Sequence, residues 1–155
     1  MPKILECEYA GTETLTPDQI RQALSGDYEG FKYFFENCLL IQDRDTRQYI
    51  HPKMNLGQQM IAKAIFKNVD KKTRENKHRE IVIIGPRQFG KSSELTAIGQ
   101  YLEAYTPGME NLNLVHTLQT GTTAGKYFKQ KIAPIVANVH PAIFPTIERD
   151  TLGTS

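Results

Sequence analysis

The chain has 155 residues, which is enough for one modest domain with a hydrophobic core. Hydrophobic residues make up 39% and charged residues 23%, as in an ordinary soluble globular protein, and the net charge of +2 does not by itself demand a nucleic-acid partner. No apolar run approaches the ~20 residues of a membrane-spanning helix, and the N-terminus lacks the apolar core of a signal peptide. Cys7 and Cys38 are too far apart in the sequence to form a metal knuckle, so we expect a reduced, cytosolic protein.

Two helices are predicted in the first forty residues. Thr16 can cap a helix, Pro17 suits its first position, and Gln19 can complete a capping box, so a helix should run from there to about Leu24. A second helix is predicted over residues 28–37, where three phenylalanines share one face. These helices should contribute to the core.

A β-hairpin is predicted over residues 38–50, because two short apolar runs flank a polar turn. Asp43 and Asp45 lie in that turn, and we interpret them as solvated turn residues rather than as metal ligands, since no further acidic residue follows in step. The four histidines show no ligand spacing, so structural roles are expected for them.

Asn55 can cap a further helix that runs to about Val69. Gln58, at the third helical position, has two interpretations: its amide can reach back to the cap, or it can recognise the edge of an adenine. The basic stretch 71–79 is interpreted as a solvated connection, with contact to a DNA backbone as the alternative.

The chemical signal of the chain is a phosphate-binding motif. An apolar run over residues 81–84 predicts a buried strand, and it leads into the pattern G-x-x-x-x-G-K-S formed by Gly85, Gly90, Lys91 and Ser92. The glycines allow loop amides to point at phosphate oxygens, and the helix that should begin near Lys91 directs further N–H groups at the same anion.

The side chains of this motif have distinct expected roles. Lys91 can reach the β- and γ-phosphates, and the hydroxyl of Ser92 is a suitable Mg²⁺ ligand, with Ser93 as a further hydroxyl at the helix start. Arg87 can stabilise the charge that develops on the phosphates, or it can pair with a carboxylate and only shape the loop. Gln88 can position water or phosphate, or lie in solvent.

A βαβ unit is predicted around the motif. After the loop, one helix should direct Leu95, Ile98 and Leu102 towards a sheet, and a second strand is expected over residues 112–116. After residue 116 no run of four apolar residues leads into Asp or Glu, although hydrolysis usually requires a carboxylate that holds Mg²⁺ and a group that orients water. Glu148 and Asp150 follow a stretch that is broken by Pro141 and Pro145.

The last part of the chain should be a helix interrupted by proline. Residues 121–126 resemble a second phosphate loop, but one residue too few separates the two glycines. Tyr127 also stands where the Mg²⁺-binding hydroxyl residue should be. We therefore expect a helix there, kinked or divided by Pro134 and carrying several lysines.

The expected fold class is α/β: a P-loop NTPase-like parallel sheet with flanking helices, truncated, and preceded by a small helical and hairpin region. Residues 1–52 form that N-terminal region in this interpretation, and residues 53–155 form the front part of a P-loop ATPase domain. Because a parallel sheet needs more than two strands, the chain is interpreted as the front of a longer protein.

The sequence Arg87-Gln88-Phe89-Gly90-Lys91-Ser92, with Gln58 some thirty residues before it, resembles the N-terminal ATPase region of tailed-bacteriophage terminase large subunits. The likeness covers about residues 31–141. It implies that Gln58 holds adenine, that Arg87 senses or stabilises the γ-phosphate, and that Mg²⁺ is bound at Ser92. The nucleotide-binding residues expected in this way are Gln58, Gly85, Pro86, Arg87, Gln88, Phe89, Gly90, Lys91, Ser92 and Ser93, with Arg87 and Lys91 as catalytic residues.

The resemblance also implies a function and partners. The full-length protein would couple ATP hydrolysis, with Mg²⁺, to the movement of double-stranded DNA into procapsids, and it would carry a nuclease domain that is absent here. The portal, the small terminase subunit and a homo-oligomeric ring are the implied partners, in the cytoplasm of a bacterial host and transiently at the procapsid. This 155-residue chain alone should turn over little or no ATP.

Two other functions remain open from the sequence. A helicase-like, nucleic-acid-dependent ATPase also combines an upstream glutamine with a phosphate loop. A non-catalytic nucleotide-binding module is the second alternative, because no hydrolytic carboxylate is evident in the sequence.

Overall fold

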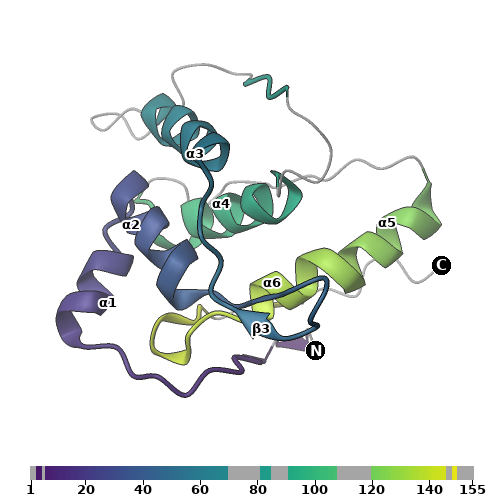
Figure 1. Ribbon diagram of the computed structural model, residues 1–155, viewed down its shortest axis with the longest axis horizontal. Helices are drawn as coiled ribbons and strands as arrows, with labels where there is room; N and C mark the ends of the chain where they lie inside the picture. Colours follow the sequence, from purple (N-terminus) through teal and green to yellow (C-terminus); the bar gives the residue numbers. More distant parts are fainter. Residues whose placement is uncertain are drawn as a thin grey trace.

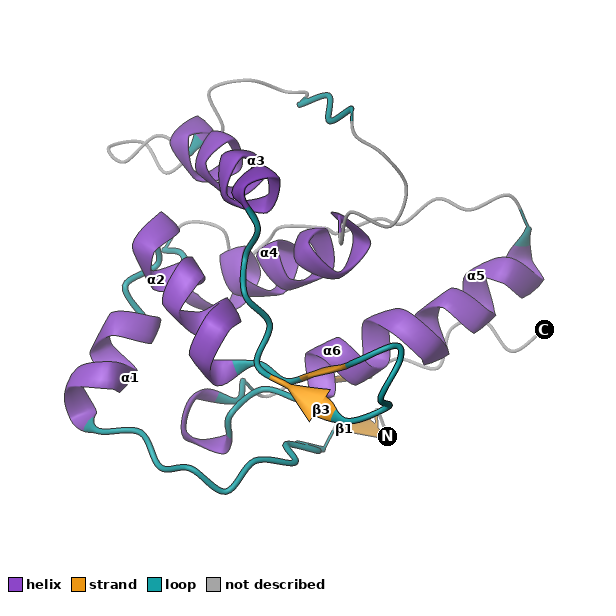
Figure 2. Ribbon diagram, in the orientation of Figure 1, coloured by secondary structure: helices purple, strands orange, loops and turns teal. Residues whose placement is uncertain are grey.

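A computed structural model describes residues 3–4, 6–69, 81–84, 91–107, 120–145 and 148–149, and these are mainly helical (Figures 1 and 2). The α-helices are α1 (Pro17–Ala23), α2 (Tyr28–Tyr33), α3 (Leu56–Asn68), α4 (Lys91–Tyr105), α5 (Gly121–Tyr127) and α6 (Ala133–Ala137). Two π-helical turns, η1 (Phe34–Cys38) and η2 (Phe128–Ile132), and one 3₁₀ turn, η3 (Pro141–Ile143), extend them. The strands are β1 (Lys3–Ile4), β2 (Ile41–Gln42), β3 (Tyr49–Ile50) and β4 (Glu148–Arg149).

The predicted α/β fold class is wrong for the part of the chain that the structure describes. β1 pairs with β4 and β2 with β3, both antiparallel, and no parallel sheet occurs in these residues. The apolar run 81–84 is not a strand, and Val82 and Ile84 are 81% and 94% exposed. An apolar run becomes a strand only where neighbouring strands supply hydrogen bonds and cover its faces. The other predicted strand of the parallel sheet, 112–116, lies outside the described residues.

The predicted helix starts of the N-terminal region are confirmed. Thr16 Oγ1 accepts from the Gln19 backbone N–H at 3.3 Å, and Gln19 Oε1 accepts from the Thr16 N–H at 2.8 Å, which is the expected capping box. The second helix is capped by Asp27, whose Oδ1 accepts from the Gly30 N–H at 2.9 Å. It continues as the π-helical turn η1, so the predicted single helix is present with a wider last part.

The hairpin and the helix after the phosphate motif also agree with the sequence. β2 and β3 form the predicted hairpin, with Ile41 opposite Ile50, and the helix after the motif is α4. The predicted division of the final helix at Pro134 is not seen, because α5, η2 and α6 follow one another without a break over residues 121–137. Proline has no N–H to donate, and the helix accommodates it next to the wider π-helical turn η2 instead of ending there.

The core surrounds α4. In Figure 1, α4 lies in the middle of the molecule, and it packs against α3, η2 and α6. Its Tyr101 is fully buried and meets two rings of the α2–η1 segment, with centroid separations of 5.5 Å to Phe31 and 5.2 Å to Phe34. Aromatic side chains bury the largest apolar areas, so these contacts dominate the packing of α4 on the N-terminal helices.

Polar contacts fix the end of α4 against the turn between α1 and α2. Tyr101 Oη donates to the Ala23 carbonyl at 2.7 Å and accepts from the Gly26 N–H at 3.0 Å, and Thr106 Oγ1 donates to the Gly26 carbonyl at 2.9 Å. Gly26 has φ 79°, and a Cβ there would lie 2.8 Å from the Tyr105 carbonyl oxygen. Only glycine meets both requirements without strain. None of the described helices is both long and apolar enough to cross a membrane.

Candidate functional site

The phosphate motif meets the described structure at the first turn of α4. Residues 85–90 lie outside the described residues. They are the expected nucleotide-binding positions Gly85, Pro86, Arg87, Gln88, Phe89 and Gly90. Lys91 is the first residue of α4, Ser92 is exposed, and Ser93 is half-buried. The predicted helix start is therefore confirmed, and the hydroxyls of Ser92 and Ser93 lie where the unpaired N–H groups of the helix favour an anion.

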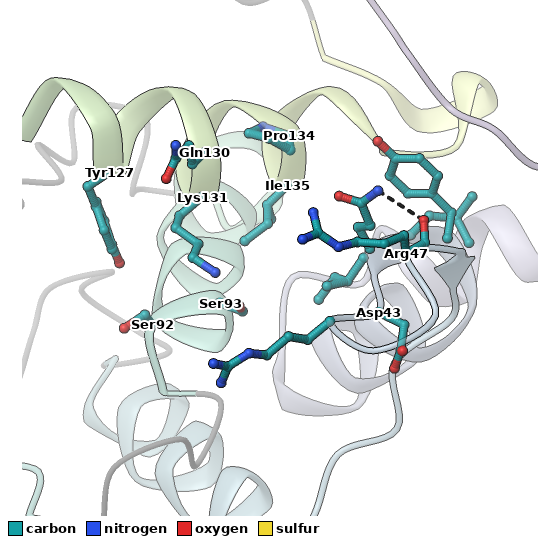
Figure 3. Close-up of a pocket in the computed structure, with 14 residues that line it drawn as sticks. Asp43, Arg47, Ser92, Ser93, Tyr127, Gln130, Lys131, Pro134 and Ile135 are labelled. Atoms are coloured by element: carbon teal, nitrogen blue, oxygen red, sulfur yellow. Dashed lines mark hydrogen bonds between the residues drawn. The ribbon is translucent and has the colours of Figure 1, made fainter.

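A pocket of about 1090 Å³ opens beside this end of α4. Three parts of the chain line it: the β2–β3 hairpin, the start of α4 at Ser92 and Ser93, and the segment from Tyr127 to Ile135. Figure 3 shows Arg47 and Lys131 extending from opposite sides of the pocket, with Ser92 and Ser93 at the end of α4 below Lys131. The pocket is large enough for a ligand of nucleotide size.

Backbone pairing places the hairpin opposite α6. Leu39 and Val139 form an antiparallel bridge, in which the Leu40 N–H donates to the Asn138 carbonyl at 3.0 Å and the His140 N–H donates to the Cys38 carbonyl at 2.8 Å. All of these residues are buried. The bridge joins the base of the hairpin to the end of α6, and so it positions the hairpin turn across the pocket from η2.

Among the described residues, three cationic side chains line the pocket. Arg44 and Arg47 belong to the hairpin turn, and Lys131 belongs to η2; all three residues are exposed. None of them forms an ion pair with another described residue. Cationic side chains without a carboxylate partner favour binding of an anion.

The one acidic side chain among the described lining residues is used by the turn itself. Asp43 Oδ1 accepts from the Asp45 N–H at 3.0 Å, the Thr46 N–H at 2.8 Å and Thr46 Oγ1 at 3.0 Å. Hydrogen bonds from Thr46 hold the pKa of Asp43 below its usual value. This arrangement confirms the interpretation of Asp43 and Asp45 as turn residues. The described lining residues therefore carry three cationic side chains and only one carboxylate.

Gln58 takes the capping role that the sequence allowed. The Gln58 N–H donates to Asn55 Oδ1 at 2.9 Å, while Gln58 Oε1 accepts from the Asn55 N–H at 3.0 Å. The side chain is buried and does not line the pocket beside Ser92. Its role in holding adenine stays a prediction.

Glu94 is a feature that sequence reasoning missed. It lies in the first turn of α4, is fully buried, and neither carboxylate oxygen has a hydrogen-bond partner among the described residues. Burial raises its pKa to about 8, so the carboxyl group is mainly protonated at neutral pH. The surroundings of α4 near Ser92 therefore receive no full negative charge from this residue.

The described histidines have structural contacts. His51 Nδ1 lies 3.0 Å from the Leu39 carbonyl oxygen and its Nε2 lies 2.5 Å from Glu13 Oε1, while His140 Nε2 lies 2.8 Å from the Glu13 carbonyl oxygen. In the described ranges, no three His, Cys, Asp or Glu side chains gather as metal ligands. His78 and His116 lie outside those ranges. Cys7 and Cys38 are unpaired thiols.

Sequence reasoning interpreted Arg44 as part of a solvated turn and did not single out Arg47 at all. The local pattern predicts a hairpin turn correctly, but the distance from that turn to α4 depends on the bridge between Leu39 and Val139. Lys131 is one of the lysines of the last predicted helix, for which the sequence indicates no binding role.

In comparisons with known proteins, no protein-family model matches the chain, and neither a curated protein nor a solved structure shows significant similarity to it.

Proposed function

We propose that this chain is the ATP-binding part of a viral DNA-packaging motor of the terminase large-subunit type. The observation that carries the proposal is that the phosphate motif leads directly into α4, the helix whose first turn lines the pocket. The pattern from Gly85 to Ser92 runs directly into α4 at Lys91, and the start of α4 borders a large pocket lined by three cationic side chains that form no ion pair with a described residue. Phosphate binding requires loop amides, a helix start and cationic side chains, and none of these depends on a parallel sheet.

In this proposal the motif binds Mg-ATP. Lys91 contacts the β- and γ-phosphates, Ser92 is a ligand of Mg²⁺, and Arg87 stabilises charge on the γ-phosphate. The other residues of the 85–93 segment surround the phosphates mainly through their backbone amides, and Gln58 remains the candidate for adenine.

The wider biological role rests on the resemblance. Within the full-length protein, ATP hydrolysis would move double-stranded DNA into procapsids, with the portal, the small subunit and a homo-oligomeric ring as partners in a bacterial host. Lys126 and Lys129 on the exposed surface of α5 and η2 are suited to contact DNA phosphates, which supports this partner class. Nuclease activity would belong to another part of that protein.

The nucleotide assignment is tested by ligand-linked stability. Mg-ATP at ~100 times its dissociation constant should raise the free energy of unfolding by about 2.7 kcal/mol, and Lys91→Ala should abolish this increase. Lys67→Ala is the matched control, because Lys67 is an exposed lysine of α3 that does not line the pocket. Thermal and urea unfolding with and without Mg-ATP measure the effect. An equal increase in the Lys91→Ala variant would contradict the site.

A non-catalytic nucleotide-binding module is the second candidate. It is favoured by the chemistry of the described lining residues, whose only carboxylate, Asp43, accepts three hydrogen bonds within its own turn. Phosphate release from Mg-ATP by the complete natural protein separates the two candidates. Turnover that is lost in Lys91→Ala supports the motor, whereas tight binding without turnover supports the module.

A further inference from the structure

The turn between β2 and β3 faces the start of α4 across the pocket, although nothing in the local sequence connects the two. We propose that Arg44 and Arg47 of this turn, together with Lys131 of η2, clamp the phosphate chain of a polyphosphate ligand whose other contacts are Ser92 and Ser93. The inference deepens the proposed function and rests on it for the identity of the ligand as a nucleotide. It assigns the hairpin a binding role that the phosphate motif alone does not contain.

The pocket concentrates positive charge. Arg44, Arg47 and Lys131 line one pocket from two elements and have no ion pair with a described residue, while the nearby Asp43 is committed to its own turn. Like charges that share a pocket repel one another. A multivalent anion bound between them attracts all three, so the net electrostatic interaction becomes favourable. The guanidinium groups offer several donors each, in the geometry that phosphate oxygens accept.

The backbone of Arg47 gives an independent reason. Arg47 has φ 60°, in the left-handed region that glycine and asparagine occupy more readily than other residues. Its N–H still donates to the Asp43 carbonyl at 3.0 Å and its carbonyl accepts from Gln42 Nε2 at 2.9 Å, so the turn holds this conformation firmly. An arginine is a poor choice for the turn itself, and Figure 3 shows its side chain extending into the pocket.

The dimensions of the pocket favour a chain of phosphates over a single one. About 1090 Å³ is far more than one phosphate group fills, and the cations stand on both sides of the space rather than around one point. Apolar lining from Ile41, Pro134 and Ile135 adds a surface for a non-ionic part of the ligand. A di- or triphosphate that carries an organic group fits this combination of surfaces.

The test is isothermal titration calorimetry on the full chain with tripolyphosphate, diphosphate, orthophosphate and Mg-ATP. Arg44→Gln, Arg47→Asn and Lys131→Gln should each weaken binding of tripolyphosphate about ten- to a hundredfold. Arg47→Asn keeps the left-handed turn, because asparagine tolerates that conformation, so its melting temperature should not fall. The control is Arg21→Gln, an exposed arginine paired with Asp18 on α1, which should change binding less than twofold.

The outcomes separate the clamp from the nucleotide site. If the three pocket variants bind as tightly as the unaltered chain while Lys91→Ala loses Mg-ATP, the clamp is wrong and the proposed function stands. If they lose tripolyphosphate while the unaltered chain does not bind Mg-ATP, the clamp stands as a polyphosphate site and the proposed function is wrong. An unaltered chain that binds none of the four compounds, or only duplex DNA, would overturn the clamp.

Discussion

At the scale of single residues, Glu94 is a buried carboxyl group in the first turn of α4. An acidic side chain in the first turn of a helix is normally stabilised as an anion by the helix dipole. Glu94 is fully buried and its oxygens have no hydrogen-bond partner among the described residues, so the cost of desolvating the anion exceeds that stabilisation and raises the pKa to about 8. The proton is therefore bound more tightly in the folded chain than in the unfolded chain.

This shift predicts a pH dependence with a defined sign. The contribution of Glu94 to stability should be complete below its ordinary pKa of 4.5 and should decline as pH rises towards about 8. Over that interval the loss should reach at most about 1.4 kcal/mol per pH unit. Glu94→Gln cannot ionise and should flatten the decline, as measured by urea unfolding at pH 5, 7 and 9.

Glu103→Gln on the same helix is the control, because Glu103 is exposed. It should leave the decline between pH 5 and 9 in place. An unchanged slope in Glu94→Gln would mean that Glu94 is hydrated or paired in solution.

At the scale of elements, α2 and α4 approach each other closely at Gly30. A Cβ on Gly30 would overlap Ser25 Oγ and Tyr101 Oη, and Tyr101 Oη is fixed by hydrogen bonds to two backbone groups. The missing side chain of Gly30 therefore lets α2 approach α4 closely. Tyr101 can then accept the hydrogen bond from the Gly26 N–H in the turn and still pack among the phenylalanine rings.

Gly30→Ala should destabilise the protein by about 1–2 kcal/mol, because overpacking at a fixed contact outweighs the ~1 kcal/mol that alanine adds to a helix. Gly125→Ala is the matched control: Gly125 is an exposed residue of α5, and a Cβ there meets nothing within 4 Å. The control should be neutral or stabilising by up to about 1 kcal/mol. Two Gly→Ala changes with the same effect on urea unfolding would contradict this account of the contact.

At the scale of the whole molecule, the N-terminal segment ties together parts of the chain that are far apart in sequence. Glu13 Oε1 accepts from Tyr9 Oη at 2.6 Å and lies 2.5 Å from His51 Nε2, while the Glu13 carbonyl contacts His140. The Glu8 N–H donates to the Ala137 carbonyl at 2.8 Å. These contacts join the N-terminal segment to residues on either side of Val139, which forms the bridge with Leu39 that positions the hairpin against α6.

The hydrogen bond from Tyr9 is the main cause that lowers the pKa of Glu13 to about 2, and a backbone hydrogen bond and the bond from His51 add to it. The contribution of its carboxylate should be complete above pH 4.5 and should disappear as pH falls towards 2. Because Glu13 is partly exposed, Glu13→Gln should cost no more than about 1 kcal/mol at pH 7. Urea unfolding at pH 7, 4 and 2.5 should show the variant and the original chain converging in acid, whereas the exposed Glu29→Gln should match the original chain throughout.

Local signals predicted the helices well. The capping boxes at Thr16 and Asn55 and the helix after the phosphate motif depend on interactions within a few residues, and all are confirmed. The division predicted at Pro134 is not seen, because α5, η2 and α6 form a continuous helical stretch. The parallel sheet was the main error. Ile84 was expected in a buried strand and is 94% exposed, because strand formation depends on partners that a local apolar run cannot specify.

The sequence by itself determined where α4 begins, and it carries the prediction of a phosphate-binding motif, since glycine spacing, a lysine and hydroxyls act within one turn of chain. Only the tertiary structure decided that Arg44, Arg47 and Lys131 share a pocket with Ser92, and that Glu94 is buried without a hydrogen-bond partner among the described residues. The physical reason is distance along the chain. The bridge between Leu39 and Val139 brings together residues a hundred positions apart, and no local pattern records such a contact.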